Sequence, residues 1–279
     1  VAQLPLAHVF EPLALGKHPG VIGWQIDNEI GTYSAIDCSA PALRAFQHYV
    51  EKKYGTVAEL NRRWGLIFWN QEIERFDQIP APTVMMCTRN PSYLLDYNRF
   101  SFEGMAEFML NQAEAIRKYA GQQFIVGSGI EAAQAAVGRL QQERGIRPID
   151  EISVHNYPEM FATMGEMAMM LDRHRALSPA GRFLVLEQQN GSGYTTTSGL
   201  NPAIRRCWAF HSLAHGANSI LWFQWRRFRA GCEWRHPCVV ERDRRPRAPY
   251  QSIWTIVAEC QKARKTTGPS RVVSDVQIL

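Results

Sequence analysis

The 279-residue sequence has few cysteines, and none of them forms a Cys-x-x-Cys pair. This scatter excludes a disulfide framework and a zinc ribbon. We therefore expect free thiols in a reducing compartment and predict a cytoplasmic location. The six cysteines are Cys38, Cys87, Cys207, Cys232, Cys238 and Cys260.

Long apolar runs are also absent. No run reaches the roughly 18 residues that a membrane-spanning helix needs. The first residues contain no basic region followed by an apolar core, so they do not resemble a signal peptide. The sequence therefore predicts no membrane partner. Because it begins with Val1 rather than Met, we expect that an N-terminal portion has been lost.

Charge of one sign is concentrated in a single stretch. The formal net charge is +5, and the Arg-rich segment from Arg235 to Arg247 is the one clear departure from mixed charges. It lacks interleaved aromatic residues, which favours a solvated loop over a nucleic-acid-binding patch. The remaining composition, 46% hydrophobic and 20% charged, is that of one globular domain with a large core.

Short apolar runs alternate with segments of helical period. This alternation is typical of repeated βα units around a parallel sheet, and hence of an α/β fold. Helices are predicted at Ala40–Tyr54, Phe100–Tyr119 and Pro202–Ala214. The stretch between Gly55 and Tyr97 is long for a connection and contains a helix of its own, which suggests a cap over a site. The five candidate strands are Val21–Ile26, Phe124–Ser128, Glu151–His155, Phe183–Leu186 and Ser219–Phe223.

Two glutamates directly follow predicted strands. Glu29 comes after the first strand and Glu187 after the fourth. In a (β/α) barrel the active site lies at the C-terminal strand ends, where such residues can face each other. Glycoside hydrolysis needs a carboxylic acid and a second carboxylate in this arrangement. Taken singly, each has a non-catalytic alternative; for Glu29 this is a carboxylate at a helix N-terminus, where the helix dipole favours it.

Four long motifs resemble those of glycoside hydrolase family 42, the β-galactosidases with a (β/α)8 TIM-barrel catalytic domain. The resemblance implies that barrel strands 4 to 8 are present and strands 1 to 3 are missing. It also implies a partial barrel at 1–270 and the start of a following domain at 271–279. In chain order, the motifs read HPGVIGWQIDNE, FQHYVEKKYGTVAELNRRWGLIFWNQ, LEQQNG and AHGANSILWFQWRRFRAGCEWRH.

The resemblance also implies roles for individual residues. Glu29 matches the general acid/base and Glu187 the nucleophile of a retaining enzyme. Tyr157 is expected to donate a hydrogen bond to the nucleophile carboxylate, and Asn28 to contact the sugar 2-hydroxyl. The residues implied to bind substrate are Asn28, Trp69, Tyr157, Phe223, Glu233 and His236.

Other aromatic residues of the second motif, Trp64 and Phe68, are expected in the core. Glu233 and His236 also have the spacing of half a metal site, but no further ligands at suitable spacing follow. Relatives often carry a zinc-binding cysteine cluster where this chain has only Cys38. We therefore predict no metal and no cofactor. His155 stands where an Asp is expected.

The predicted function is retaining hydrolysis of terminal β-galactosides or related oligosaccharides. Retention requires carboxyl groups roughly 5 to 5.5 Å apart. Two alternatives stay open: a non-catalytic carbohydrate-binding remnant, and a retaining hydrolase for another β-linked sugar such as an arabinoside. Many relatives form trimers, so a full-length chain is compatible with a homotrimer.

Overall fold

The computed structural model describes residues 16, 18–33, 36–83, 89–120, 122–191, 200–268 and 271–273. The chain forms two compact units, residues 1–149 and 150–279, each of which is described by itself. Most of the expected following domain at 271–279 lies outside the described residues. None of the described helices combines the length and apolarity needed to cross a bilayer.

The N-terminal unit contains two parallel strands, β1 (Gly23–Ile30) and β2 (Phe124–Gly129). Ile26 and Ile125 of these strands are buried against α4 (Pro91–Ala120) and α5 (Glu131–Arg144). Helix α4 is longer than the predicted Phe100–Tyr119. The Asn90 side chain accepts hydrogen bonds from the backbone of Ser92 and Tyr93, which caps the helix just before its first residue, Pro91.

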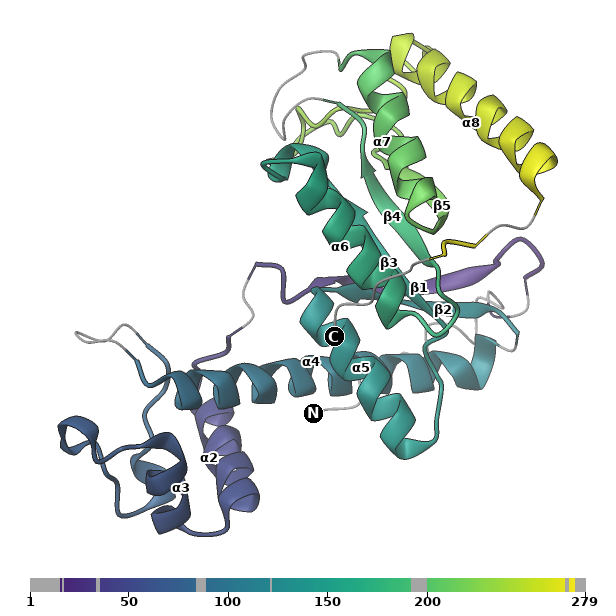
Figure 1. Cartoon of the computed structure of the whole chain (residues 1–279). Helices are drawn as coiled ribbons and strands as arrows, with labels where there is room; N and C mark the ends of the chain where they lie inside the picture. The colour runs from purple at the N-terminus through teal and green to yellow at the C-terminus, as the bar shows by residue number, and fades with distance from the viewer. Residues whose placement is uncertain are drawn as a thin grey trace. The chain divides into compact units, whose positions relative to one another are not determined.

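A helical extension, residues 36–83, lies at the end of α4 remote from the two strands (Figure 1). It contains α2 (Ala40–Tyr54), α3 (Val57–Trp64) and two short helices, η2 (Phe68–Asn70) and η3 (Phe76–Gln78). Its core packs on the first turns of α4, where Phe46 lies 4.4 Å from Tyr97 between ring centroids. Trp64 is buried in this core as predicted. Phe68 is 63% exposed, so its predicted core position is wrong.

A buried carboxylate joins this extension to α4. Asp96 of α4 accepts hydrogen bonds from Lys53 Nζ at 2.5 Å, Tyr54 Oη at 2.5 Å and Trp64 Nε1 at 3.0 Å. Its burial raises the carboxyl pKa, but the three donors outweigh burial and leave this pKa below its ordinary value. The network therefore holds three helices in one arrangement.

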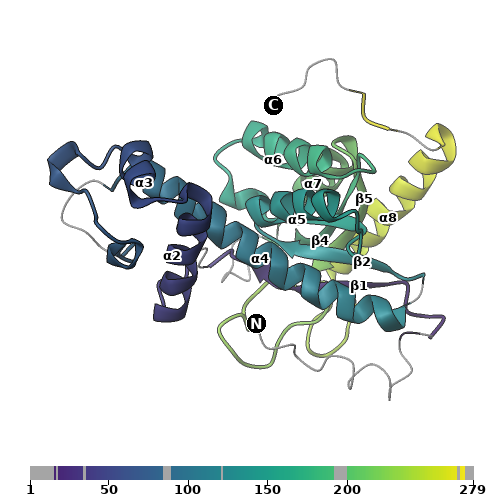
Figure 2. The same cartoon turned by 90° about the horizontal axis from the view of Figure 1, so that it is seen from below.

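The C-terminal unit contains three parallel strands, β3 (Glu151–Asn156), β4 (Phe183–Gln189) and β5 (Ala217–Phe223). Helices α6 (Met164–Leu177) and α7 (Pro202–Ala214) lie side by side along them (Figure 2). Helix α8 (Ala248–Thr267) packs on α7. Five predicted strands are thus present, and the parallel α/β class is confirmed, although most strand ends differ from the expected ones.

Candidate active site

Glu187 lies near the carboxyl end of β4 and is half-buried, whereas Gln188 and Gln189 after it are buried. Its Cα is in register with His155 of β3, and neighbours in a parallel pair place their side chains on the same face of the sheet. His155 Nδ1 lies 3.5 Å from Glu187 Oε2, and the Glu187 side chain keeps 17% of its surface exposed. The carboxylate is therefore held among neighbouring side chains and remains reachable from solvent.

Tyr157 also contacts this carboxylate. Its hydroxyl donates a hydrogen bond of 2.6 Å to Glu187 Oε2, and the tyrosine is 6% exposed. Short hydrogen bonds to an ionised acceptor are strong and fix its orientation. The hydrogen bond expected from the sequence is therefore present, and it fixes one oxygen of Glu187.

An aromatic wall continues from Tyr157. The His236 ring lies edge-on to Tyr157 at 6.2 Å and to Phe223 at 4.8 Å, measured between centroids. His236 is 1% exposed. Glu233 lies one turn earlier, where its carbonyl accepts a 2.9 Å hydrogen bond from the His236 amide. The structure thus brings Tyr157, Phe223 and His236 together beside Glu187, with Glu233 at the edge of the group.

Buried side-chain amides next to Tyr157 and Glu187 form a hydrogen-bond network that stabilises this arrangement. Asn156 donates to Gln188 Oε1 at 3.0 Å and to Ser212 Oγ at 3.1 Å. Gln189 donates to Glu159 at 2.8 Å. Asn156 directly precedes Tyr157, and Gln188 and Gln189 directly follow Glu187 in the chain. Because buried polar side chains are costly to leave unpaired, the network restricts both strand ends to one conformation.

Glu29 lies near the end of β1, in a bulged part of the strand. The register jumps between Ile26 and Ile30, and Asp27 and Glu29 have positive φ values of 53° and 49°. Such values are uncommon for residues other than glycine and concentrate at functional sites. The Glu29 amide donates to Ser128 Oγ at 3.2 Å, which ties the bulge to β2.

Asn28 lies between the two strained residues of this bulge. Its side-chain oxygen accepts a 3.2 Å hydrogen bond from Gln25, and its backbone amide donates to Asp27 at 2.8 Å. The amide side chain is exposed. This geometry orients Asn28 toward solvent beside Glu29.

Trp69 lies elsewhere in the N-terminal unit. It belongs to η2 in the helical extension, is 64% exposed and stacks on Phe68 at 4.7 Å between centroids. Its position in a sugar site stays a prediction. Within each unit taken alone, the described residues bring no three His, Cys, Asp or Glu side chains close enough to share an ion.

The contact of His155 with Glu187 and the amide network were missed by sequence reasoning. His155 and Tyr157 are two residues apart, so both face the same side of the sheet at the end of β3. That spacing was a usable signal. The pairing of Asn156 with Gln188 and Ser212 depends on inter-strand register, which no local pattern specifies.

Comparisons with known proteins agree with this architecture. Residues 11–263 match the family model of glycoside hydrolase family 42, described as beta-galactosidase. The β-galactosidase BgaH of Haloferax lucentense is 30% identical over 261 residues, which cover 87% of this chain and 38% of that protein. A β-galactosidase of Thermus thermophilus is 30% identical over 234 residues, covering 76% of this chain and 35% of the relative.

Solved structures give the same result. The β-galactosidase of the Antarctic haloarchaeon Halorubrum lacusprofundi matches with a TM-score of 0.80 and 26% identity, over 96% of this chain and 42% of that one. The enzyme of psychrophilic Marinomonas ef1 matches at 0.78 and 25% identity, over 93% of this chain and 42% of that one. The chain thus spans about two fifths of these proteins and has the fold of the corresponding part of their TIM barrel. It belongs to glycoside hydrolase family 42.

Proposed function

We propose that this chain carries the catalytic carboxylates of a retaining β-galactosidase, with Glu187 as nucleophile and Glu29 as general acid/base. The observation that best supports this role is the 2.6 Å hydrogen bond from Tyr157 to Glu187 at a strand end. A carboxylate that is oriented but still 17% exposed is suited to attack a substrate carbon.

In the first step, one Glu187 oxygen attacks the anomeric carbon of the galactose. The bond from that carbon to the glycosidic oxygen breaks, and Glu29 gives its proton to the leaving oxygen. The products are a galactosyl ester of Glu187 and the free alcohol. This step also requires that the attacking carboxylate be correctly oriented. The hydrogen bond from Tyr157 fixes its rotamer.

In the second step, the Glu29 carboxylate takes a proton from water as the water oxygen attacks the same carbon. The ester bond to Glu187 breaks and galactose leaves with its original anomeric configuration. A retaining double displacement requires two carboxyl groups roughly 5 to 5.5 Å apart in the substrate complex. We assign Asn28 to the 2-hydroxyl, Phe223 to the apolar ring face, and Glu233 and His236 to other hydroxyls. We also propose that Trp69 contacts the sugar.

The test is hydrolysis of an aryl β-galactoside followed by proton NMR. We expect release of the phenol and the β-anomer of galactose as the first sugar product, before mutarotation mixes the anomers. First formation of the α-anomer would contradict the proposed mechanism. Galactose binding without turnover would indicate a non-catalytic carbohydrate-binding protein. Faster hydrolysis of an aryl arabinoside would indicate that arabinose, not galactose, is the sugar that is cleaved off.

The contact between Tyr157 and Glu187 allows a finer prediction. Replacing Tyr157 by Phe removes only the hydroxyl, and a hydrogen bond to a charged group is worth about 1.5 to 3 kcal/mol. We expect kcat to fall roughly 10- to 100-fold with little change in KM, because the bond acts on the nucleophile rather than on bound sugar.

His155→Gln serves as the matched comparison, since His155 lies farther from the same oxygen, at 3.5 Å. We expect its kcat to fall less than about fivefold, because charged hydrogen bonds weaken beyond normal contact distance. Equal losses in both variants, or a fall in thermal stability that parallels the loss of kcat, would refute a specific role for the hydroxyl.

Two further proposals rest on the sequence. The scattered cysteines favour a cytoplasmic location. Because many members of the family form trimers, a chain of the relatives' length is proposed to form a homotrimer. Cell fractionation and light scattering of that longer protein are the respective tests.

A further inference from the structure

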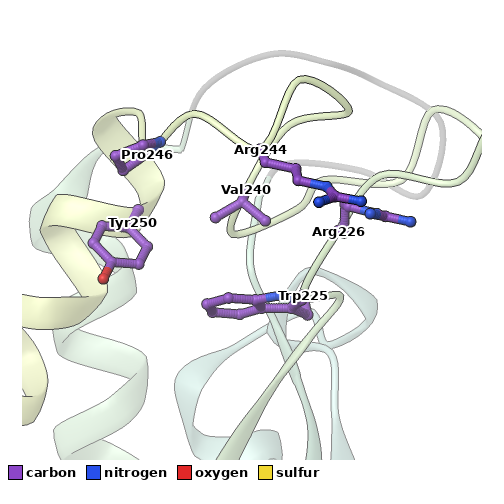
Figure 3. A pocket seen from close by; sticks show the side chains of 6 residues that line it. All are labelled: Trp225, Arg226, Val240, Arg244, Pro246 and Tyr250. Atoms are coloured by element: carbon purple, nitrogen blue, oxygen red, sulfur yellow. The ribbon is translucent and has the colours of Figure 1, made fainter.

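A pocket of about 400 Å³ opens in the C-terminal unit, in the segment that follows β5 (Figure 3). It begins two residues after Phe223, and none of its lining residues has a role in the proposed mechanism. Such a volume lies at the lower end of the range for small-molecule sites. The lining residues are Trp225, Arg226, Val240, Arg244, Pro246 and Tyr250.

The backbone of this pocket is ordered by pairing of two segments. The Val240 amide donates to the Trp225 carbonyl at 2.8 Å, and the Arg227 amide donates to the Val240 carbonyl at 3.3 Å. Val240 also pairs with Pro246 on its other side. Val240 and Tyr250 belong to a small apolar cluster with Ile253. Backbone hydrogen bonds and apolar packing therefore order the lining of the pocket, which is not a gap between unconnected loops.

Aromatic rings line two parts of it. Trp225 is 63% exposed, and its ring lies 6.4 Å from that of Tyr250 at an angle of 63°. Figure 3 shows Tyr250 and Pro246 on one side, with Trp225 and the two arginines on the other. An exposed indole beside a half-buried phenol suits the C–H faces of a sugar ring, which is apolar on its faces and polar at its edge.

The charge of the chain is concentrated around this pocket. Residues 225–250 contain eight of the 31 basic residues and three of the 26 acidic ones, so the rest of the chain has equal numbers of each. The formal excess of +5 therefore belongs to this segment. An anion that approaches the molecule meets its positive potential here.

Two of the three acidic side chains in residues 225–250 are already engaged by other arginines. Arg227 binds both oxygens of Glu241, at 2.7 and 2.9 Å, and Arg247 binds Asp243 at 2.8 Å. Arg226 and Arg244 are exposed and line the pocket, and in the described part of the chain neither forms an ion pair. Figure 3 shows both arginine side chains extending away from Tyr250 at the edge of the pocket, where their two guanidinium groups are available to an anionic ligand.

We propose that this pocket binds an anionic pyranose, a sugar ring that carries a carboxylate or a sulfate, as the unit to which the cleaved galactose is attached. The aromatic side chains contact the ring, and Arg226 and Arg244 bind the acidic group. The link to a cleaved galactose rests on the proposed hydrolase function, whereas binding of the sugar does not. A nucleic-acid strand fits less well, because it needs basic side chains along an extended groove.

The test is calorimetric titration with D-glucuronate and with D-galactose 6-sulfate, beside D-galactose and inorganic sulfate as controls. The two acidic sugars distinguish a carboxylate from a sulfate. We expect at least one of them to bind at low salt, and binding to weaken as salt is raised. Arg226→Gln and Arg244→Gln should each weaken it about tenfold, the loss of one charged hydrogen bond. Trp225→Ala should weaken it about fivefold.

Arg229→Gln is the matched control, because Arg229 is an exposed arginine of the same segment that does not line the pocket. It should leave binding unchanged. The proposal is overturned if neither acidic sugar binds, if the pocket variants bind as well as the parent, or if inorganic sulfate or an oligonucleotide binds as tightly. Hydrolysis of an aryl β-galactoside is measured in parallel. Hydrolysis without acidic-sugar binding rejects the pocket alone, and binding without hydrolysis rejects the proposed function alone.

Discussion

Glu187→Ala should lower kcat/KM for aryl β-galactoside hydrolysis by about 10⁴-fold or more, because it removes the group that forms the covalent intermediate. Azide should restore turnover by entering the space that the side chain leaves. It would then attack the anomeric carbon from the face opposite the leaving group and give α-galactosyl azide. NMR of the product identifies the anomer.

Glu29→Ala should behave differently with the same reagent. With a good aryl leaving group, the first step needs little acid assistance, so the galactosyl ester of Glu187 forms and accumulates. Azide then replaces water in the second step and gives β-galactosyl azide. We expect kcat to fall about 10²- to 10⁴-fold without azide, the usual contribution of a general acid/base, because the slowed second step limits kcat.

The opposite anomers make the two assignments separable. Glu166→Ala is the matched control, since Glu166 is an exposed glutamate at the start of α6 in the same unit as Glu187. It should change kcat/KM less than twofold. Formation of the same azide anomer by both variants, or full activity in either, would show that the roles are wrongly assigned.

Asp96→Asn should give the largest loss of stability. The substitution keeps the size of the side chain but removes the charge that accepts from Lys53, Tyr54 and Trp64. Losing one partner of a buried ion pair costs about 3 to 5 kcal/mol. Because Lys53 keeps 33% of its side chain exposed, we expect a smaller fall, about 2 to 3 kcal/mol, in the free energy of unfolding.

The same network predicts how stability depends on pH. The folded state lowers the pKa of Asp96, so its contribution is complete above the ordinary carboxyl range and is lost as pH falls through the lowered pKa. Burial, with a contribution from Asp96, raises the pKa of Tyr54 from 10.0 to about 12. Its contribution is therefore present below pH 10 and is lost as pH rises through about 12.

Urea unfolding at pH 7 and at pH 3, followed by circular dichroism, measures the effect of Asp96, and unfolding at about pH 12 measures that of Tyr54. The difference between the parent and Asp96→Asn should shrink at the lower pH. Asp77→Asn is the control, because Asp77 pairs with Arg75 on the surface, with side-chain exposures of 66% and 64%. Its loss should stay within about 0.5 kcal/mol. A control loss as large as that of Asp96→Asn would argue against the buried network as the cause.

Strand identity was predictable because it depends on local composition. Each of the five buried apolar runs is a strand in the structure, and the family motifs indicated the barrel to which they belong. The end of β1 was not predictable. The bulge at Asp27 and Glu29 requires positive φ at residues that are not glycine, and only contacts such as that of Glu29 with Ser128 select it.

The burial of Phe68 was predicted wrongly. This apolar side chain, four residues after Trp64, was expected in the core, but residue type says nothing about whether a partner surface exists at that position. Trp64 has one, the Asp96 network and its aromatic neighbours, and Phe68 stacks only on exposed Trp69 among the ring contacts of the described residues. Burial is a tertiary property even within a single motif.

The sequence alone was sufficient for the α/β class, the strand order along the chain and the choice of Glu29 and Glu187 as candidates. Local periodicity and residue chemistry carry that information over a few residues. The pairing of Asn156 with Gln188 and Ser212 and the arginine-lined pocket were decided only by tertiary structure. Each depends on the register of segments far apart in the chain, which packing of helices and side chains sets and no local pattern records.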